Sequence, residues 1–453
     1  MKKLVLMLCL LIPSASLFAQ QGSVGIPGFS FVAPLKVAVG TDNNFLVDRT
    51  PPVERVFVLS LPPSIQPLAP DIRPKRLSDE VMTLTLPKLA FQNYGRRHEL
   101  VLTYVPQIEM FRTNSDQNSW SHDAALTFTY HLSRSLQFSV GDAYRTSKDP
   151  ALTLQNVFLL LPRSRYEENG IRGQVDFKAS GVTDFQVRYD STRTTYGQTD
   201  PFQTRIFDNT AKGLAIQVTH FLSRTQRLRV KTSFYKFQPI DQAKPLDDAV
   251  DTSRAYQHLM RSVDVQYRLR TTPSTYLSFQ GGASQIIKGL TYTVGVGADK
   301  RFGGWWLGGG YTRSLSFIAW GPTFFANGLN PQGFYDAIYI STRAWLTDRS
   351  TFQFRLTGAR GSADGLAAPS QSLMGYARFD YRLNDRTVWF ASMDRFQQNR
   401  NDYVATPLMR NRFMTGVEFS ITSERERRTN RLNEDALYVP ITDHTAGRRD
   451  RVD

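Results

Sequence analysis

Basic side chains at alternate positions are the most regular chemical feature of this 453-residue chain. Arg227, Arg229 and Lys231 occupy every second position, and Leu228 and Val230 fill the positions between them. In a β-strand this spacing puts the charges on one face and the apolar side chains on the other. A row of fixed positive charge attracts anions from water. The pattern therefore predicts selection or binding of solutes.

The same alternation defines twelve candidate pore-lining cations on the polar faces of predicted strands. They are Arg172, Lys178, Arg188, Arg227, Arg229, Lys231, Arg268, Arg270, Arg343, Arg355, Arg378 and Arg382. With Arg395 added, thirteen basic residues stand against six acidic ones, Asp176, Asp190, Asp264, Asp299, Asp380 and Glu418. This excess of seven predicts a positive field. Pairs such as Arg378 and Asp380 leave a second interpretation open, a lattice of cross-strand salt bridges that fills the interior.

Residues that could catalyse a reaction or bind a metal lack the necessary spacing. The six histidines form no HxH or HxxxH pair, the spacings that bring two imidazoles to one metal ion. His220 lies on an apolar face, where a packed neutral histidine is expected. The glycines at 303–304 and 308–310 lie in alternating sequence, with no following helix to bind a phosphate. We predict no catalytic residue, no metal and no cofactor.

Period-2 alternation recurs from about Glu99 to Ile421, which predicts an all-β chain. Seven short connections, at 132–135, 180–183, 222–225, 272–274, 301–304, 346–350 and 383–387, join fourteen strands. Longer connections alternate strictly with the short ones, an asymmetry typical of outer-membrane barrels. One more strand at each end gives about 16 strands, with 14–18 as the range. Thr83–Phe91 is an additional candidate strand.

The two ends of the chain have a different character. Residues 1–19 combine Lys2 and Lys3 with an apolar run and small residues before Ala19, which predicts a signal peptide. Residues 20–94 are predicted to be a Pro-rich periplasmic segment or a strap in the lumen, because proline donates no ladder hydrogen bond. Residues 422–453 are predicted to form a charged periplasmic tail.

The membrane assignment depends on the absence of a long apolar run and on the alternation of polar and apolar residues. No apolar run after the signal peptide reaches ~18 residues, so no later transmembrane helix is expected. An exported chain is then either soluble or a closed barrel, because in lipid only helices and closed barrels satisfy the backbone. Alternation favours a transmembrane antiparallel β-barrel over residues 95–421.

The last predicted strand resembles the β-signal of bacterial outer-membrane proteins. Its residues are Thr415-Gly416-Val417-Glu418-Phe419-Ser420-Ile421: a polar residue, glycine, then apolar residues at alternate positions. The resemblance implies an assembly signal at Thr415, Gly416, Phe419 and Ile421 that the barrel-assembly machinery recognises. The general resemblance to outer-membrane β-barrels covers about residues 95–421 and implies the bacterial outer membrane, with both termini periplasmic.

These features favour a passive or weakly anion-selective channel for small polar solutes. The alternatives are a barrel for export or attachment of surface polysaccharide, a structural outer-membrane protein, and an adhesin or enzyme. Expected partners are outer-membrane lipid, the assembly machinery, and anionic solutes or polysaccharide. Nucleic acid is not expected, because the arginines alternate with apolar residues and do not cluster. The oligomeric state is left open.

Overall fold

A computed structural model describes residues 29–31, 34–43, 78–148, 165–196, 209–239, 258–286, 289–317, 332–363, 370–399 and 408–420. The predicted signal peptide, the proline pairs at 51–52 and 62–63, Ile421 and the charged tail lie outside the described residues. Twenty β-strands and one short 3-10 helix, Ser115–Gln117, form in the described part. No helix in it is long and apolar enough to span a membrane.

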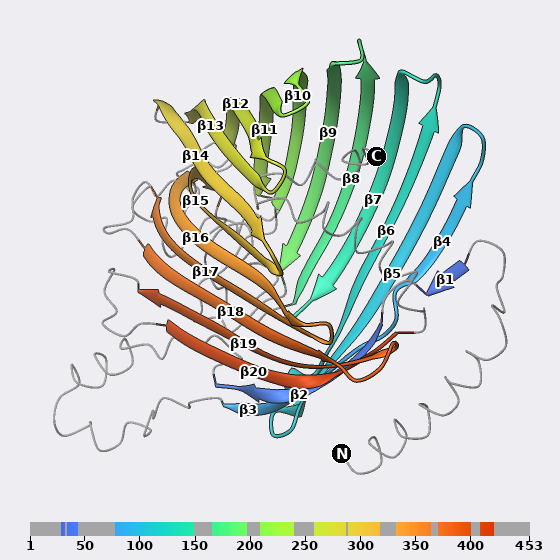
Figure 1. Ribbon diagram of the computed structural model, residues 1–453, viewed down its shortest axis with the longest axis vertical. Coiled ribbons are helices and arrows are strands. Elements are labelled where there is room, and N and C mark those ends of the chain that lie inside the picture. Colours follow the sequence, from blue (N-terminus) through green and yellow to red (C-terminus); the bar gives the residue numbers. More distant parts are fainter. Residues whose placement is uncertain are drawn as a thin grey trace, which may run out of the picture.

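Sixteen strands follow one another as an antiparallel meander, each paired with the next (Figure 1). They are β5 His98–Phe111, β6 Ser119–His131, β7 Leu136–Ser147, β8 Tyr166–Lys178, β9 Thr183–Tyr196, β10 Asn209–Ser223, β11 Gln226–Pro239, β12 His258–Thr272, β13 Thr275–Ile286, β14 Gly289–Phe302, β15 Trp305–Phe317, β16 Gln332–Thr347, β17 Ser350–Ala363, β18 Ser370–Arg382, β19 Thr387–Asn399 and β20 Leu408–Phe419.

Two interrupted strands from the N-terminal region close the ring, one made of β1 and β2 and the other of β3 and β4. β2, Leu35–Asp42, pairs with β20 on one side and with β3, Asp79–Thr85, on the other, and β3 pairs with β5. The short β1, Phe29–Phe31, pairs with β4, Leu89–Tyr94, which continues the edge along β5. The described part of the chain thus forms a closed antiparallel barrel of 18 strands.

The described barrel has 18 strands rather than about 16, at the upper end of the predicted range of 14–18, and it includes strands before residue 95. Residues 29–31, 35–42, 79–85 and 89–94, assigned to a periplasmic segment or strap, are barrel wall, and the candidate strand Thr83–Phe91 overlaps the end of β3 and the start of β4. The prediction treated the prolines of this region as evidence against strands. Pro34 and Pro87 lie between β1 and β2 and between β3 and β4, where a missing donor interrupts a strand without ending it.

The connections define two ends of the barrel. One end carries the short turns, which connect β4 to β5 and the two strands of each of the seven predicted hairpins. The start of β1 and the end of β20 lie at this end too. The Ser420 amide there donates to the Arg386 carbonyl in the β18–β19 turn, at 2.7 Å. The strict alternation of short and long connections has one exception, because only residues 287–288 separate β13 from β14 at the other end.

The two faces of the wall differ in polarity. We call the exposed outward row the apolar band: Leu102, Leu126, Phe128, Phe138, Val140, Ile171, Phe177, Phe185, Val187, Leu214, Ile216, Val230, Phe234, Val263, Val265, Phe279, Val296, Leu307, Ile338, Ile340, Leu373, Met393 and Phe413. The opposite face is concave, because its side chains meet across intervening strands: Arg378 of β18 reaches Glu418 of β20. An exposed apolar exterior around a polar interior is the arrangement that lipid requires.

The end of β2 and the start of β3 both lie opposite the short turns. We therefore expect a cysteine at Ser64 to be accessible from the same side as one at Asn156. A cysteine at Ser180, in the β8–β9 turn, should be labelled only from the other side. The measurement is labelling of intact cells with a membrane-impermeant thiol reagent. Labelling of Ser180→Cys together with protection of the other two would reverse the topology.

Candidate functional site in the barrel lumen

All twelve predicted cations lie on the inner face. The pairing register shows this strand by strand: Arg227, Arg229 and Lys231 on β11 lie opposite Arg268, Gln266 and Asp264 on β12. On β18, Arg378 and Arg382 alternate with the outward Phe379 and Tyr381. Arg395 is the exception among the thirteen basic residues. It shares the outward positions of β19 with Trp389 and Met393 and lies opposite Gly375 and Asn411.

Sequence reasoning missed many acidic residues on the inner face. The eight additional ones in the described strands are Asp42, Asp79, Glu99, Glu109, Asp123, Glu168, Asp184 and Asp394. The additional basic ones are Lys36, Arg145, Arg301, Arg410 and Arg412. Seventeen basic residues therefore face fourteen acidic ones in the described lumen, and the expected excess of seven falls to three. The alternation of β6 and β9 could have revealed Asp123 and Asp184.

The remaining positive charge is concentrated on one wall. We call the inner face of β11–β18 the basic sector, and its ten cations are Arg227, Arg229, Lys231, Arg268, Arg270, Arg301, Arg343, Arg355, Arg378 and Arg382. Only Asp264, Asp299 and Asp380 oppose them there. The rest of the described lumen has seven basic and eleven acidic residues. The lumen is therefore polarised from one wall to the other.

Several cations of the basic sector lie over aromatic rings. The guanidinium groups of Arg268 and Arg270 lie 4.9 and 5.6 Å from the centre of the Tyr276 ring. Arg343 lies 5.1 Å from the ring of Trp345. A ring face attracts a cation without cancelling its charge. All three of these cations lie near short turns.

Other inner-face cations take part in the salt-bridge lattice that the sequence left open. Arg378 contacts Asp380 at 2.6 Å and Glu418 at 2.7 Å. Asp190 binds both Arg172, at 2.8 Å, and Arg188, at 2.6 Å. These contacts support the salt-bridge interpretation for part of the inner wall, and Arg378 belongs both to this lattice and to the basic sector. Selection of solutes by the remaining positive charge stays a prediction.

A polar cavity of about 740 Å³ lies against the inner face of β6–β11. Asp176 accepts hydrogen bonds from the amides of Gln174 and Gln186, each at 2.8 Å. Gln217 and Thr129 also line the cavity. Its lining also includes several arginine, lysine, aspartate and glutamate side chains, together with apolar ones. The amides, hydroxyls and charged groups can exchange hydrogen bonds with water or with a hydroxyl-rich solute.

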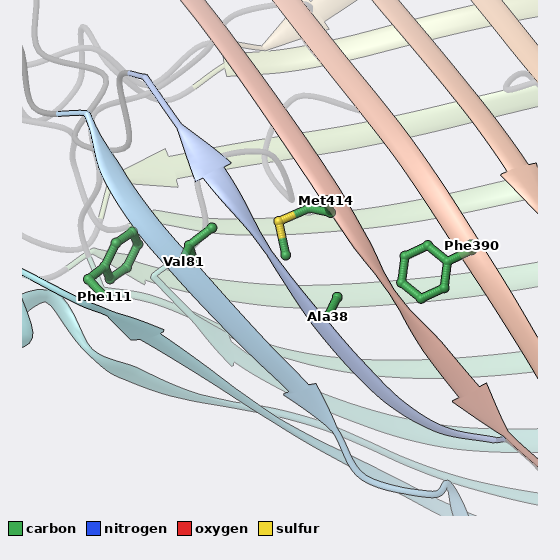
Figure 2. Close-up of a cluster of buried hydrophobic side chains, with 5 residues drawn as sticks. All are labelled: Ala38, Val81, Phe111, Phe390 and Met414. Carbon is green, nitrogen blue, oxygen red and sulfur yellow. The ribbon is translucent and has the colours of Figure 1, made fainter. Parts of the chain in front are cut away.

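The seam between β20 and β2 contains a buried apolar cluster. Ala38, Val81, Phe111, Phe390 and Met414 form a buried cluster there, contributed by β2, β3, β5, β19 and β20 (Figure 2). Buried ion pairs flank it toward the long connections: Arg410 with Asp42 at 2.6 Å, and Arg412 with Glu109 at 2.7 Å. Apolar packing and paired charges therefore join the first strands to the last.

Three of the four predicted assembly-signal residues lie in this seam. Gly416 lies between Phe390 and Ala38, Phe419 lies opposite Thr387 and Leu35, and the Thr415 hydroxyl donates to the Phe390 carbonyl. Ile421 lies outside the described residues. These positions are equally consistent with a structural role, so recognition by the assembly machinery stays a prediction.

The remaining motifs have structural explanations. The His220 ring lies outward and meets the Thr183 hydroxyl at 2.9 Å. A side chain at Gly310 would approach the Val296 carbonyl at 2.5 Å, so glycine there allows β14 and β15 to pack closely. No group of three metal-binding side chains was found within the described residues. Trp306 and Trp345 lie on the inner face, whereas Trp120, Trp305 and Trp389 lie outward.

A closed barrel with an apolar exterior and a charged interior defines the class. The described part of the chain has the architecture of an outer-membrane β-barrel protein, a closed antiparallel barrel with an apolar outer face.

Comparison with known proteins gives distant structural similarity alone. No protein-family model matches the chain, and no curated protein sequence matches it. The siderophore receptor PirA from Pseudomonas aeruginosa is similar with a TM-score of 0.40 and 8% identity, over 86% of this chain and 81% of that one. The copper transporter OprC has a TM-score of 0.42 and 11% identity, over 75% of this chain and 72% of that one.

Proposed function

We propose that the protein is a passive, weakly anion-selective channel for small polar solutes. The basic sector supports this proposal, because its ten cations face only three carboxylates on β11–β18. Barrels of 16–18 strands are wide enough to hold an aqueous channel. Fixed charge in a low-dielectric wall focuses the field and enriches counter-ions. The acidic residues elsewhere in the lumen offset part of that field, which is why selectivity is weak. No catalytic role is proposed.

The test is ion selectivity in a planar bilayer. With 0.1 M salt on one side and 1 M on the other, the purified chain should conduct and give a reversal potential of the sign for anion preference. Arg268→Gln with Arg270→Gln should move that potential toward zero, because both cations lie on the inner wall near a short turn. These residues are cleaner probes than the buried Arg229. The preference should weaken when both solutions are concentrated, as the Debye length falls from ~10 Å at 0.1 M to ~3 Å at 1 M.

The control is Lys300→Gln with Arg261→Gln, which removes two cations from outward positions of β14 and β12. It should leave the reversal potential unchanged. Cation preference, or equal effects of the two double variants, would contradict the proposal. If the full chain does not conduct, the next test is a variant with residues 44–77 replaced by a short turn. Conduction by this variant would mean that the removed segment plugs the lumen. Failure of that variant too would favour a structural barrel.

One observation favours a second candidate function, export or attachment of surface polysaccharide. The cavity around Asp176 presents amides and hydroxyls, which suit a hydroxyl-rich chain. If this function is correct, soluble oligosaccharides should interrupt the ion current. Gln186→Leu, which removes one hydrogen-bond donor to Asp176, should shorten the interruptions.

A further inference from the structure

The outer wall has an unbalanced positive patch. Arg193 of β9, Lys212 of β10, Lys236 of β11 and Arg261 of β12 all occupy outward positions on four adjacent strands. We call these four residues the outer basic patch. All four side chains are exposed. The outward positions of β9–β12 that the structure describes include no acidic residue.

Two of these cations lie in an unfavourable arrangement. Lys212 and Lys236 are direct cross-strand partners on the same face. Like charges placed directly opposite each other destabilise a sheet. Arg193 and Arg261 occupy the diagonal positions on either side. A bound anion would turn this repulsion into attraction.

The position of the patch indicates what kind of anion it binds. Next to it, toward the short turns, the apolar band continues with Leu214 and Ile216 on β10, Phe234 on β11 and Val263 on β12. The patch thus lies at the edge of the apolar band that faces the long connections. In a bilayer, this edge meets the polar headgroups of one leaflet, with the acyl chains against the band below.

Another group of outward cations, on β15 and β17, has a carboxylate between them. Arg313 of β15 and Arg360 of β17 are also outward, and Asp336 of β16 lies directly opposite both. Asp336 pairs with Arg313 at 3.3 Å and accepts a hydrogen bond from the Tyr311 hydroxyl at 2.7 Å. The outer basic patch has no such carboxylate on its own strands.

We propose that the outer basic patch binds the phosphate groups of a phosphorylated lipid in the leaflet next to the long connections, while the acyl chains of that lipid lie along the apolar band. The site is formed by β9–β12 and uses two recognition elements together, charge above and hydrocarbon contact below. It is independent of whether the lumen conducts ions.

Binding is measured with the full chain in detergent, using bis-phosphorylated lipid A as the probe. Lys212→Gln with Lys236→Gln should weaken binding roughly twenty-five-fold, at about fivefold for each cation near an anionic surface. The matched control, Arg313→Gln with Arg360→Gln, removes two outward cations from β15 and β17 and should change binding less than twofold. Phosphatidylethanolamine, which has no net charge, should bind at least tenfold more weakly than lipid A.

A second measurement guards against misfolding and identifies the source of the phosphate. Lipid A should raise the unfolding temperature of the native chain and not that of Lys212→Gln with Lys236→Gln. Without lipid, the unfolding temperature of this double variant should equal or exceed that of the native chain, because the repulsion between the two lysines is removed. Inorganic phosphate at the same concentration should compete poorly, since it lacks acyl chains. Equal lipid binding by the two double variants would overturn the proposal. Displacement by inorganic phosphate alone would overturn the lipid assignment and leave a simple anion site.

Discussion

Replacing Arg410 with methionine is expected to destabilise the barrel by about 3–5 kcal/mol, the usual effect of breaking a buried ion pair from one side. Asp42 and Arg410 side chains are 1% and 6% exposed, and their closest atoms are 2.6 Å apart. The variant leaves the Asp42 carboxylate buried without its charged partner. Because this pair joins β2 to β20, the seam should open first. The measurement is urea unfolding in detergent, monitored by the heat-modifiable band.

Two controls show whether the pair itself is responsible. Arg410→Met with Asp42→Asn removes both charges and should recover much of the lost stability, since no uncompensated charge remains. Arg145→Met breaks the pair with Asp123, whose side chains are 43% and 49% exposed, and should cost less than about 1 kcal/mol. If the double variant is no more stable than Arg410→Met alone, the buried charge is not the cause of the loss.

Replacing Gly416 with valine is expected to prevent closure of the barrel. A Cβ at this position would fall on the backbone carbonyl of Val37 on the neighbouring β2, far inside contact distance. Backbone cannot rotate away as a flexible side chain can, so β20 and β2 must separate. The cost should reach or exceed the upper end of the roughly 1–3 kcal/mol typical of overpacking. We expect a large loss of the heat-modifiable, membrane-inserted fraction.

A variant on the partner strand separates packing from signal recognition. Gly40 of β2 has the same constraint, because a Cβ there would fall on the carbonyl of Phe413. Gly40→Val leaves Thr415-Gly416-Val417 intact, so an equal defect would assign the effect to packing in the seam. Normal assembly of Gly40→Val beside failure of Gly416→Val would instead support recognition of the predicted assembly signal. Gly173→Ala, with no atom within 4 Å of the added Cβ, should be tolerated.

Little of the closure could be predicted, for a physical reason visible at this seam. The ion pair between Asp42 and Arg410 joins residues 368 positions apart. No local pattern encodes which strand meets which across that distance. β1 and β2 are also short and separated near Pro34, so their alternation is weak.

The sequence by itself determined the two faces of the wall. Successive side chains of a strand point to opposite faces, so Arg227, Arg229 and Lys231 could be assigned to the interior before any pairing was known. Turn residues determined seven hairpins in the same local way. Both signals depend on neighbours in the chain, which is why they remained valid when the strand count did not.

Only the tertiary structure decided what those faces contact. Register placed Asp264 beside Lys231 and curvature brought Glu418 to Arg378, which decided which inner-face cations have a carboxylate beside them. It also put Lys212 opposite Lys236 on the outside, leaving the charge that a lipid phosphate could neutralise. Charge balance depends on distances between strands, and these are fixed only when the ring closes between β2 and β20.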